Sequence, residues 1–380
     1  MSAANPTEKG AAFVDQLYAR ANEAHVIDLG REYPTFDPPA ALIRHALKYV
    51  QTSSNLRAPC EGILPLRQSI ASRLNQMYSH SYDPETEITV TAGGTQGMHT
   101  AISALVEEGD EVIVFEPAHE TYVPAILSNG GRPAYITLKK CHFRIDWEEV
   151  QKMINSRTRL IIINTPHNPT GTILSSFDME RLQKIIQGTR IRVISDEVFE
   201  YLIYEDFEHQ SVARFPSLAE NSLIISSFGK SFHVSGWKIG YCAGPSSLME
   251  KFRRKQQFQI HSATVPFQYA LSDYLNGEFS PVAVSQFYEN KRNFFIDQLK
   301  KTGFKIIRPL GTFFILLDFE QVSKQKDTEF AEYLLEKKGI LVLPLSVFHH
   351  DYYNQFLLRL CFARPEEQLI EAAARMPEQI

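Results

Sequence analysis

Residues 226–240 read SSFGKSFHVSGWKIG and place a lysine, Lys230, within a loop of small residues. An apolar run, 223–225, comes just before this segment, and a second one, 239–242, closes it. A lysine that directly follows a buried strand is partly desolvated, which lowers its pKa and favours the neutral amine. Such an amine can form a Schiff base with an aldehyde. Taken alone, however, the segment is more typical of a surface lysine in an ordinary loop.

Outward from this segment, short β-branched runs alternate with stretches of helical periodicity. The runs are nearly continuous in apolar residues, which is typical of strands buried on both faces of a mostly parallel sheet. Between them, 96–106 and 178–187 carry apolar residues at helical spacing. The alternation predicts an α/β sandwich with right-handed crossovers. The predicted strands are 88–91, 111–115, 160–163, 191–194, 223–225 and 239–242.

The two ends of the chain have a different pattern. After about Ala270 the segments predict a smaller α+β unit. Before about Leu42, a group of three prolines predicts irregular structure. The prolines are Pro34, Pro38 and Pro39; the C-terminal helices are expected at 285–302, 327–338 and 366–376, and the strands at 305–308, 313–318, 340–344 and 357–362.

Composition excludes several classes of protein. The 380 residues include 39 Lys and Arg against 44 Asp and Glu, a formal charge of -5, so the chain lacks the broad basic face that nucleic acid requires. No apolar run approaches the ~20 residues of a membrane helix, and residues 1–10 do not resemble a secretory signal. Four dispersed cysteines (Cys60, Cys141, Cys242, Cys361) argue against a disulfide scaffold or a cysteine zinc site. We expect a soluble, cytoplasmic protein.

Three further segments follow predicted strands. NTPHNPTG (164–171) places Asn168 beyond a strand end, although the octet is also an ordinary Pro/Gly turn. In SDEVF (195–199), Asp196 could pair with a protonated ring nitrogen or simply cap a helix. TAGGTQ (91–96) leads into a helix whose free N–H groups could bind an anion. Since ligands bind beyond the carboxyl ends of strands, a lysine, an acid, an asparagine and an anion cradle together fit pyridoxal phosphate (PLP).

At this point the chain resembles the class I/II aminotransferases, PLP enzymes of fold type I, and within them most the methionine and kynurenine aminotransferase branch. The resemblance implies a three-layer α/β sandwich with a mostly parallel seven-stranded sheet at 42–275. A smaller α+β domain would be built from 1–41 and 276–380, and a homodimer would share its active sites between subunits. The motifs that carry it are AGGTQ (92–96), NTPHNPTG (164–171), SDEVF (195–199), SSFGKSFHVSGWKIGY (226–241), LPLSVF (343–348) and LLRLCFA (357–363).

The resemblance also assigns roles to residues. Lys230 would form the Schiff base and move a proton at the substrate Cα, and Asp196 would hold the ring nitrogen protonated. Arg359 would bind the substrate α-carboxylate with its planar fork, and Asn168 would bond the ring oxygen. Tyr122 would stack on the ring. The phosphate would be held by Gly94, Thr95, Gln96, Ser227 and Lys238.

Three positions depart from the family pattern. Phe199 replaces a tyrosine that donates to the ring oxygen, and Arg57 replaces a tyrosine that reaches the phosphate from the partner subunit. Glu32, next to Tyr33, replaces a glycine beside the substrate carboxylate. These departures predict an altered substrate range or reaction outcome. Glu32 would read a cationic group of the substrate, or pair with Arg31 or Arg57.

The resulting expectation is a ping-pong aminotransferase that moves the amino group of an apolar or aromatic L-amino acid, methionine-like ones favoured, to a 2-oxo acid. The alternative is a PLP enzyme that eliminates, substitutes or oxidises its amino acid. A regulatory protein would need a DNA-binding module, for which we expect no room before Val26. His349 and His350, with Asp351, could form a metal cluster, but the sequence shows no third ligand at a suitable spacing. We therefore expect a solvated loop and no metal.

Overall fold

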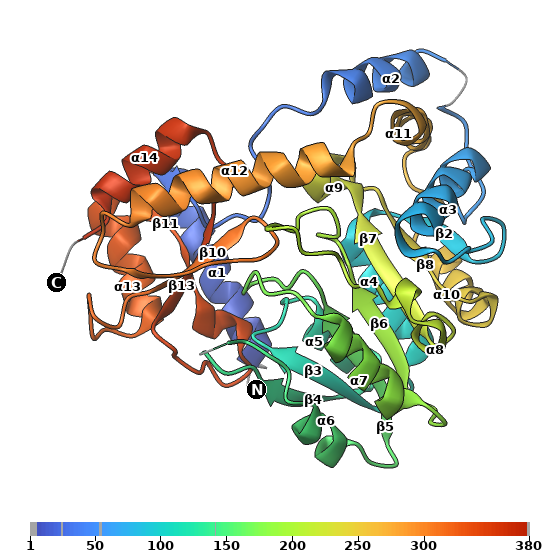
Figure 1. Ribbon diagram of the computed structural model, residues 1–380, viewed down its shortest axis with the longest axis horizontal. Helices are drawn as coiled ribbons and strands as arrows, with labels where there is room; N and C mark the ends of the chain where they lie inside the picture. The colour runs from blue at the N-terminus through green and yellow to red at the C-terminus, as the bar shows by residue number, and fades with distance from the viewer. Residues whose placement is uncertain (1–5, 24–25, 53–54, 141, 378–380) are drawn as a thin grey trace.

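The computed structural model describes residues 6–23, 26–52, 55–140 and 142–377. Its largest sheet has seven strands, drawn on the right of Figure 1. β8 runs antiparallel to both of its neighbours, and the remaining pairs are parallel. In spatial order the strands are β2 (Ile88–Thr91), β8 (Gly240–Ala243), β7 (Ser222–Ser227), β6 (Arg192–Asp196), β5 (Thr158–Asn164), β3 (Glu111–Glu116) and β4 (Arg132–Thr137).

Two apolar cores cover the two faces of this sheet. In β5, Leu160 and Ile162 belong to one core while Ile161 and Ile163 belong to the other. The continuous apolar run in the sequence therefore reflects burial on both sides. This is the predicted three-layer α/β sandwich. One face carries α4 (Gly93–Leu105), α5 (Tyr122–Ser128) and α10 (Ser246–Gln259); the other carries α3 (Leu64–Tyr78), α6 (Trp147–Met153), α7 (Ser176–Ile186), α8 (Pro216–Ala219) and α11 (Val265–Gly277).

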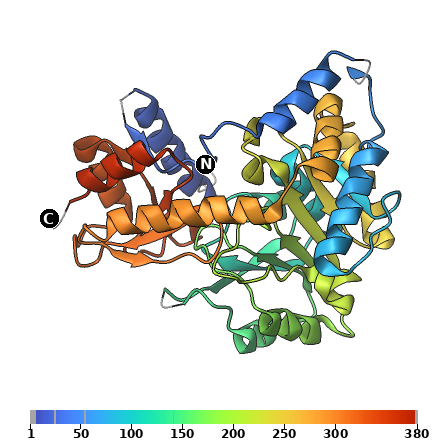
Figure 2. The same ribbon diagram turned by 45° about the horizontal axis from the view of Figure 1, so that its top comes forward.

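A second, smaller unit combines the two chain ends. Its antiparallel sheet has the order β12 (Leu343–Pro344), β13 (Leu357–Cys361), β10 (Phe314–Asp318) and β9 (Lys305–Ile307). Around it lie α1 (Pro6–Glu23), α13 (Asp327–Tyr333) and α14 (Glu366–Arg375), while α2 (Ala40–Val50) packs on α11. The long helix α12 (Pro281–Leu299) runs from the large sheet to this unit (Figure 2). We retain the division at 42–275 as a proposal.

Two local predictions were wrong. The N-terminal segment is not irregular throughout, because α1 places Val14, Leu17 and Ala21 at helical spacing in the core. The three prolines that suggested irregular structure lie beyond this helix. The strand expected at 340–344 is two short strands: β11 (Ile340–Leu341) pairs with β1 (Ile27–Asp28), whereas β12 pairs with β13.

The sheet topology places four strand ends together. β5, β6 and β7 are parallel and end at Asn164, Asp196 and Ser227. β2 points the same way, because β8 is antiparallel to both β2 and β7. The segments singled out in the sequence therefore meet at one edge of the sheet. In the described ranges, no helix is long and apolar enough to span a lipid bilayer.

Candidate active site

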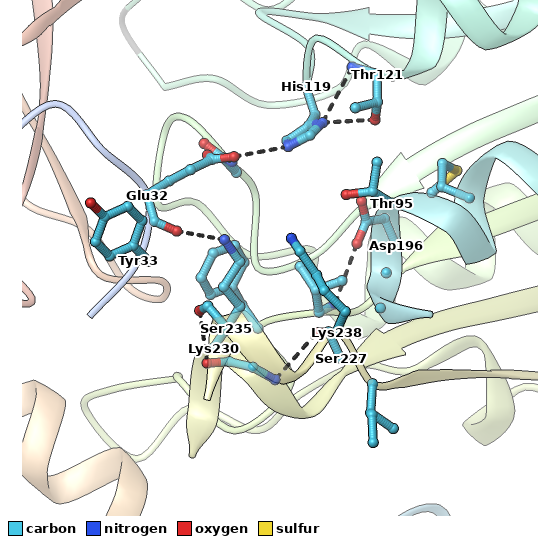
Figure 3. A pocket seen from close by; sticks show the side chains of 18 of the residues that line it. Glu32, Tyr33, Thr95, His119, Thr121, Asp196, Ser227, Lys230, Ser235 and Lys238 are labelled. Carbon is cyan, nitrogen blue, oxygen red and sulfur yellow. Dashed lines mark hydrogen bonds and ion pairs between the residues drawn. The ribbon is translucent and has the colours of Figure 1, made fainter. Parts of the chain in front are cut away.

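A cavity of about 220 Å³ opens at this edge of the sheet. Figure 3 shows side chains from the large sheet on one side and the segment of Glu32 and Tyr33 on the other. Of the residues predicted from the sequence, nine line the cavity: Glu32, Tyr33, Gly94, Thr95, Asn168, Asp196, Ser227, Lys230 and Lys238. A site of this size is several times the ~30 Å³ share of one water molecule.

Lys230 lies on the short helix α9 (Phe228–Ser231), directly after β7. Its Nζ donates a hydrogen bond to the backbone carbonyl of Glu32 at 2.6 Å and lies 5.9 Å and 5.8 Å from the ring centroids of Phe199 and Phe313. Burial lowers the pKa of Lys230. The surroundings therefore favour a neutral amine that can act as nucleophile and base.

Asp196 is a buried carboxylate that faces the cavity from the end of β6. The Tyr122 hydroxyl donates to its Oδ2, and the backbone N–H of Val198 donates to Oδ1 at 3.3 Å. Burial raises the pKa of Asp196, while the Tyr122 hydrogen bond and the charge on His119 oppose the rise. A cationic N–H group in the cavity would stabilise the charged form of this buried acid.

Small residues and N–H groups form a second corner of the cavity. Gly94 and Thr95 lie in the first turn of α4, where no side chain caps the helix. A Cβ on Gly94 would come within 2.9 Å of the Val198 side chain, so glycine allows this close approach. Ser227 and Lys238 line the same region. Free N–H groups, a hydroxyl and an ammonium suit an anion such as phosphate.

Four predicted site residues do not line the cavity. Tyr122 lies behind Asp196. The Gln96 side chain accepts from the Ala92 N–H and donates to Thr100, so it serves the start of its own helix. Arg57 is exposed on its own chain. Arg359 is buried and separated from the cavity by its own partners.

His119 lines the cavity where Tyr122 was expected, and sequence reasoning missed it. β3 ends at Glu116 and α5 begins at Tyr122, so the loop between them lies at the sheet edge. The end of the predicted strand at 111–115 was the sequence feature that could have placed His119 at the edge of the sheet. Burial lowers the pKa of His119, but the surrounding negative charges, with the Glu32 carboxylate first among them, raise the pKa overall.

Arg359 and Glu32 form a buried polar cluster with Asn168. Arg359 Nη1 donates to Asn168 Oδ1 at 2.8 Å and to Glu32 Oε2 at 3.1 Å, and Nη2 donates to the Gly30 carbonyl at 3.1 Å. Asn168 Nδ2 donates to the same Glu32 oxygen at 2.9 Å. Of the expectations for Glu32, the pairing with Arg31 is wrong, because Arg31 pairs with Asp28.

A second buried arginine holds the segment that carries Glu32. Arg364 donates to the backbone carbonyls of Asp28, Arg31 and Tyr33 at 2.6, 2.9 and 2.6 Å. A guanidinium that satisfies three carbonyls fixes the backbone between them. The N-terminal loop is thereby tied to the end of β13.

The segment His349-His350-Asp351, expected to be a solvated loop, is exposed at Asp351 but buried at His349. His349 is buried, and His350 Nδ1 lies 2.7 Å from the buried carboxylate of Glu116 while its ring stacks on Tyr135. The loop thus packs on the end of β3. Within the described part of the chain, no three His, Cys, Asp or Glu side chains are grouped to hold a metal ion.

We expect His167 to make the stability of the fold dependent on pH. It is buried beside the cavity with Nδ1 at 2.7 Å from Thr170 Oγ1, and burial lowers its pKa to about 4. Between pH 6.5 and 4 the unfolded chain binds more protons at this site. Stability should therefore be complete above pH 6.5 and fall by up to about 3 kcal/mol toward pH 4. Urea unfolding across this range should show the loss in wild type and a smaller one in His167→Asn. The exposed His142→Asn should keep the wild-type slope; an unchanged slope in His167→Asn would contradict the assignment.

Comparison with known proteins identifies the family and the fold. The family model for aminotransferase class I and II matches residues 24–376. The chain belongs to the class I and II aminotransferases. This aminotransferase is 39% identical to a methionine aminotransferase of Escherichia coli (strain K12), with 97% of this chain and 95% of the relative covered. The prediction of family, of fold type and of an amino-group-transferring enzyme is confirmed; nothing in the comparisons supports elimination, substitution or oxidation.

Solved structures agree with this assignment. The E. coli protein YbdL, reported with a methionine aminotransferase function, superposes with a TM-score of 0.93 at 39% identity, covering 95% of this chain and 96% of that one. An N-succinyldiaminopimelate aminotransferase of Mycobacterium tuberculosis superposes with a TM-score of 0.91 at 31% identity and 95% coverage of both chains. These relatives use different amino donors, so the fold alone does not set the donor.

Proposed function

We propose that this aminotransferase uses pyridoxal 5'-phosphate to take the amino group from large apolar or aromatic L-amino acids, methionine-like ones favoured, and to pass it to a 2-oxo acid in a ping-pong reaction. The observation that carries the proposal is that Lys230, Asp196 and Asn168 line one cavity. The similarity to a methionine aminotransferase supports the choice of donor.

The residues of the cavity fit the cofactor. The anion-binding corner at Gly94, Thr95, Ser227 and Lys238 would hold the phosphate. Asp196, a buried acid without a cationic hydrogen-bond partner among the described residues, would bind the ring nitrogen. When bound, the cofactor supplies an aldehyde that reacts with amines and a ring that withdraws electrons from the amine-bearing carbon.

Each protein group then has a task that follows from its environment. The neutral amine of Lys230 would accept a proton from the substrate Cα and deliver it to the carbon that carries the aldehyde of the cofactor. Asp196 would keep a proton on the ring nitrogen, and Tyr122 holds Asp196 in place by its hydrogen bond. Asn168 would hydrogen-bond the ring oxygen, and Arg359 would bind the substrate carboxylate. Tyr33 and Phe199 line the cavity beside these groups.

We further infer a homodimer in which Arg57 contributes to the partner's site. Arg57 is exposed and lies outside its own chain's cavity. Nearby, Leu47, Val50 and Leu56 leave 58, 48 and 72% of their surface exposed. Exposed apolar patches of this kind mark interaction surfaces. Sedimentation should give the mass of two chains, and Leu56→Asp should shift it toward one; a single-chain mass in wild type would contradict the dimer.

A cytoplasmic location remains part of the proposal. It is supported by Cys60, Cys242 and Cys361, which are free thiols in the structure. Cys141 lies outside the described residues.

Absorption spectroscopy tests the function. Purified protein loaded with pyridoxal phosphate should lose its visible band on addition of methionine or phenylalanine, and a 2-oxo acid should restore it. Absence of a bound chromophore would overturn the cofactor assignment. Release of ammonia without a 2-oxo acid acceptor would instead overturn amino-group transfer.

A further inference from the structure

Glu32 covers the cation that a substrate carboxylate needs. Arg359 is only 1% exposed and does not line the cavity, whereas Glu32 and Asn168, its two side-chain partners, do. The Glu32 carboxylate thus lies between the guanidinium and the cavity, with Oε2 at 3.1 Å from Arg359 Nη1. An incoming carboxylate meets a negative charge at the position where it would bind.

We propose that Glu32 is a specificity-determining residue that competes with the substrate carboxylate for Arg359, so that carboxylate substrates bind only by displacing it. This inference rests on the proposed function, because it takes Arg359 as the carboxylate-binding group. Two carboxylates that face one guanidinium repel each other, so both do not occupy the same Nη1 position.

The contacts of Glu32 indicate that it is the group that moves. Its side chain remains 26% exposed, whereas that of Arg359 is 1% exposed. Glu32 accepts a single hydrogen bond from Arg359, from Nη1 to Oε2. This contact is weaker than the bidentate ion pair that a free carboxylate can form with a guanidinium. Arg359 also keeps a buried Nε–H without a hydrogen-bond partner in the described structure, so its hydrogen-bonding capacity is not fully used.

His119 is a second hydrogen-bond partner of the Glu32 carboxylate, so this carboxylate is not left unpaired when it moves away from Arg359. Its Nε2 lies 3.2 Å from Glu32 Oε1, the oxygen that does not contact Arg359. The carboxylate of Glu32 also raises the pKa of His119, against the effect of burial. When Glu32 leaves Arg359, it therefore keeps a hydrogen-bond partner at Oε1.

Only the fraction of protein in which Arg359 is free binds a carboxylate. The apparent Kd for carboxylates therefore equals the intrinsic Kd divided by that fraction. Removing Glu32 removes this loss of affinity. We expect Glu32→Ala to bind a simple carboxylate at least about tenfold more tightly than wild type. Glu32→Gln keeps the size of the side chain but removes its charge, and should show a smaller gain in the same direction.

Titration calorimetry on the cofactor-loaded protein tests this with 3-phenylpropionate, which lacks an amine and so does not react. Its neutral amide measures apolar binding alone and should bind equally to all variants. Glu120→Gln, an exposed glutamate on the same loop as His119, is the matched control and should bind 3-phenylpropionate as wild type does. Unchanged or weaker carboxylate binding in both Glu32 variants would overturn the proposal.

A second experiment tests the opposite hypothesis, in which Glu32 stays on Arg359 and the enzyme selects amines that have no carboxylate. If wild type converts 3-phenylpropylamine and the Glu32 variants lose that conversion, the proposal is overturned. Failure of the proposed function has a different signature: no spectral response to any amino acid in wild type. Carboxylate binding is measured separately from turnover, so the two failures are distinguishable.

Discussion

Replacing Lys230 by alanine should abolish amino-group transfer, with a rate loss on the order of 10⁴-fold or more. Lys230 is the amine whose environment favours the neutral form: burial lowers its pKa, and its Nζ donates to the Glu32 carbonyl at 2.6 Å. Alanine removes the nucleophile and the base together. Stopped-flow absorption with methionine and with 2-oxo acid would measure both half-reactions.

Lys238→Ala is the matched control for this substitution. Lys238 lines the same cavity and its side chain points into it in Figure 3, but the role that we propose for it is anion binding. Its loss should weaken cofactor binding while transfer persists when the cofactor is in excess. Equal residual rates in the two variants under saturating cofactor would contradict the role assigned to Lys230.

Replacing Asp196 by asparagine should lower the turnover number by roughly 10²–10³-fold, because breaking a buried charge pair costs about 3–5 kcal/mol. Asparagine keeps the size of the side chain and can still meet the Tyr122 hydroxyl, but it does not keep a ring nitrogen protonated. Steady-state kinetics and the absorption spectrum of the loaded protein would show the effect. Since the charge rather than the packing is removed, the melting temperature should change little.

Asp206→Asn provides the comparison for Asp196. Asp206 is exposed and has a positive φ of 59°, a conformation that asparagine adopts readily. Kinetics and stability should both match wild type. A turnover number for Asp196→Asn within threefold of this control would rule out its role at the ring nitrogen.

Much of the fold was predictable because the pattern of apolar residues in the sequence shows which faces of a strand are buried. The run at 160–163 is apolar at every position since its neighbours alternate between two cores. Loop residues at strand ends then followed from parallel topology, which is why Asn168, Asp196 and Lys230 were placed correctly at one sheet edge. The α1 helix was missed because nearby prolines dominated the composition of the N-terminal segment.

The contacts between distant loops were not predictable in the same way. Glu32 and Arg359 meet across 327 residues, and no periodicity relates a loop to a strand at that separation. The departure at Glu32 was visible in the sequence, but its partner was not. His119 was overlooked because an aromatic ring three residues later matched the expected role better.

The ties between the chain ends have a consequence for motion. Arg364 holds the backbone at Asp28, Arg31 and Tyr33, and β1 pairs with β11 just before the chain enters the sheet of Arg359. The segments that carry Glu32 and Arg359 therefore belong to one rigid unit. A rotation of this unit against the seven-stranded sheet would leave their mutual distance unchanged and alter the separation of both from Lys230. Hinge motion alone would thus not release Arg359; the release requires a rotation of the Glu32 side chain itself.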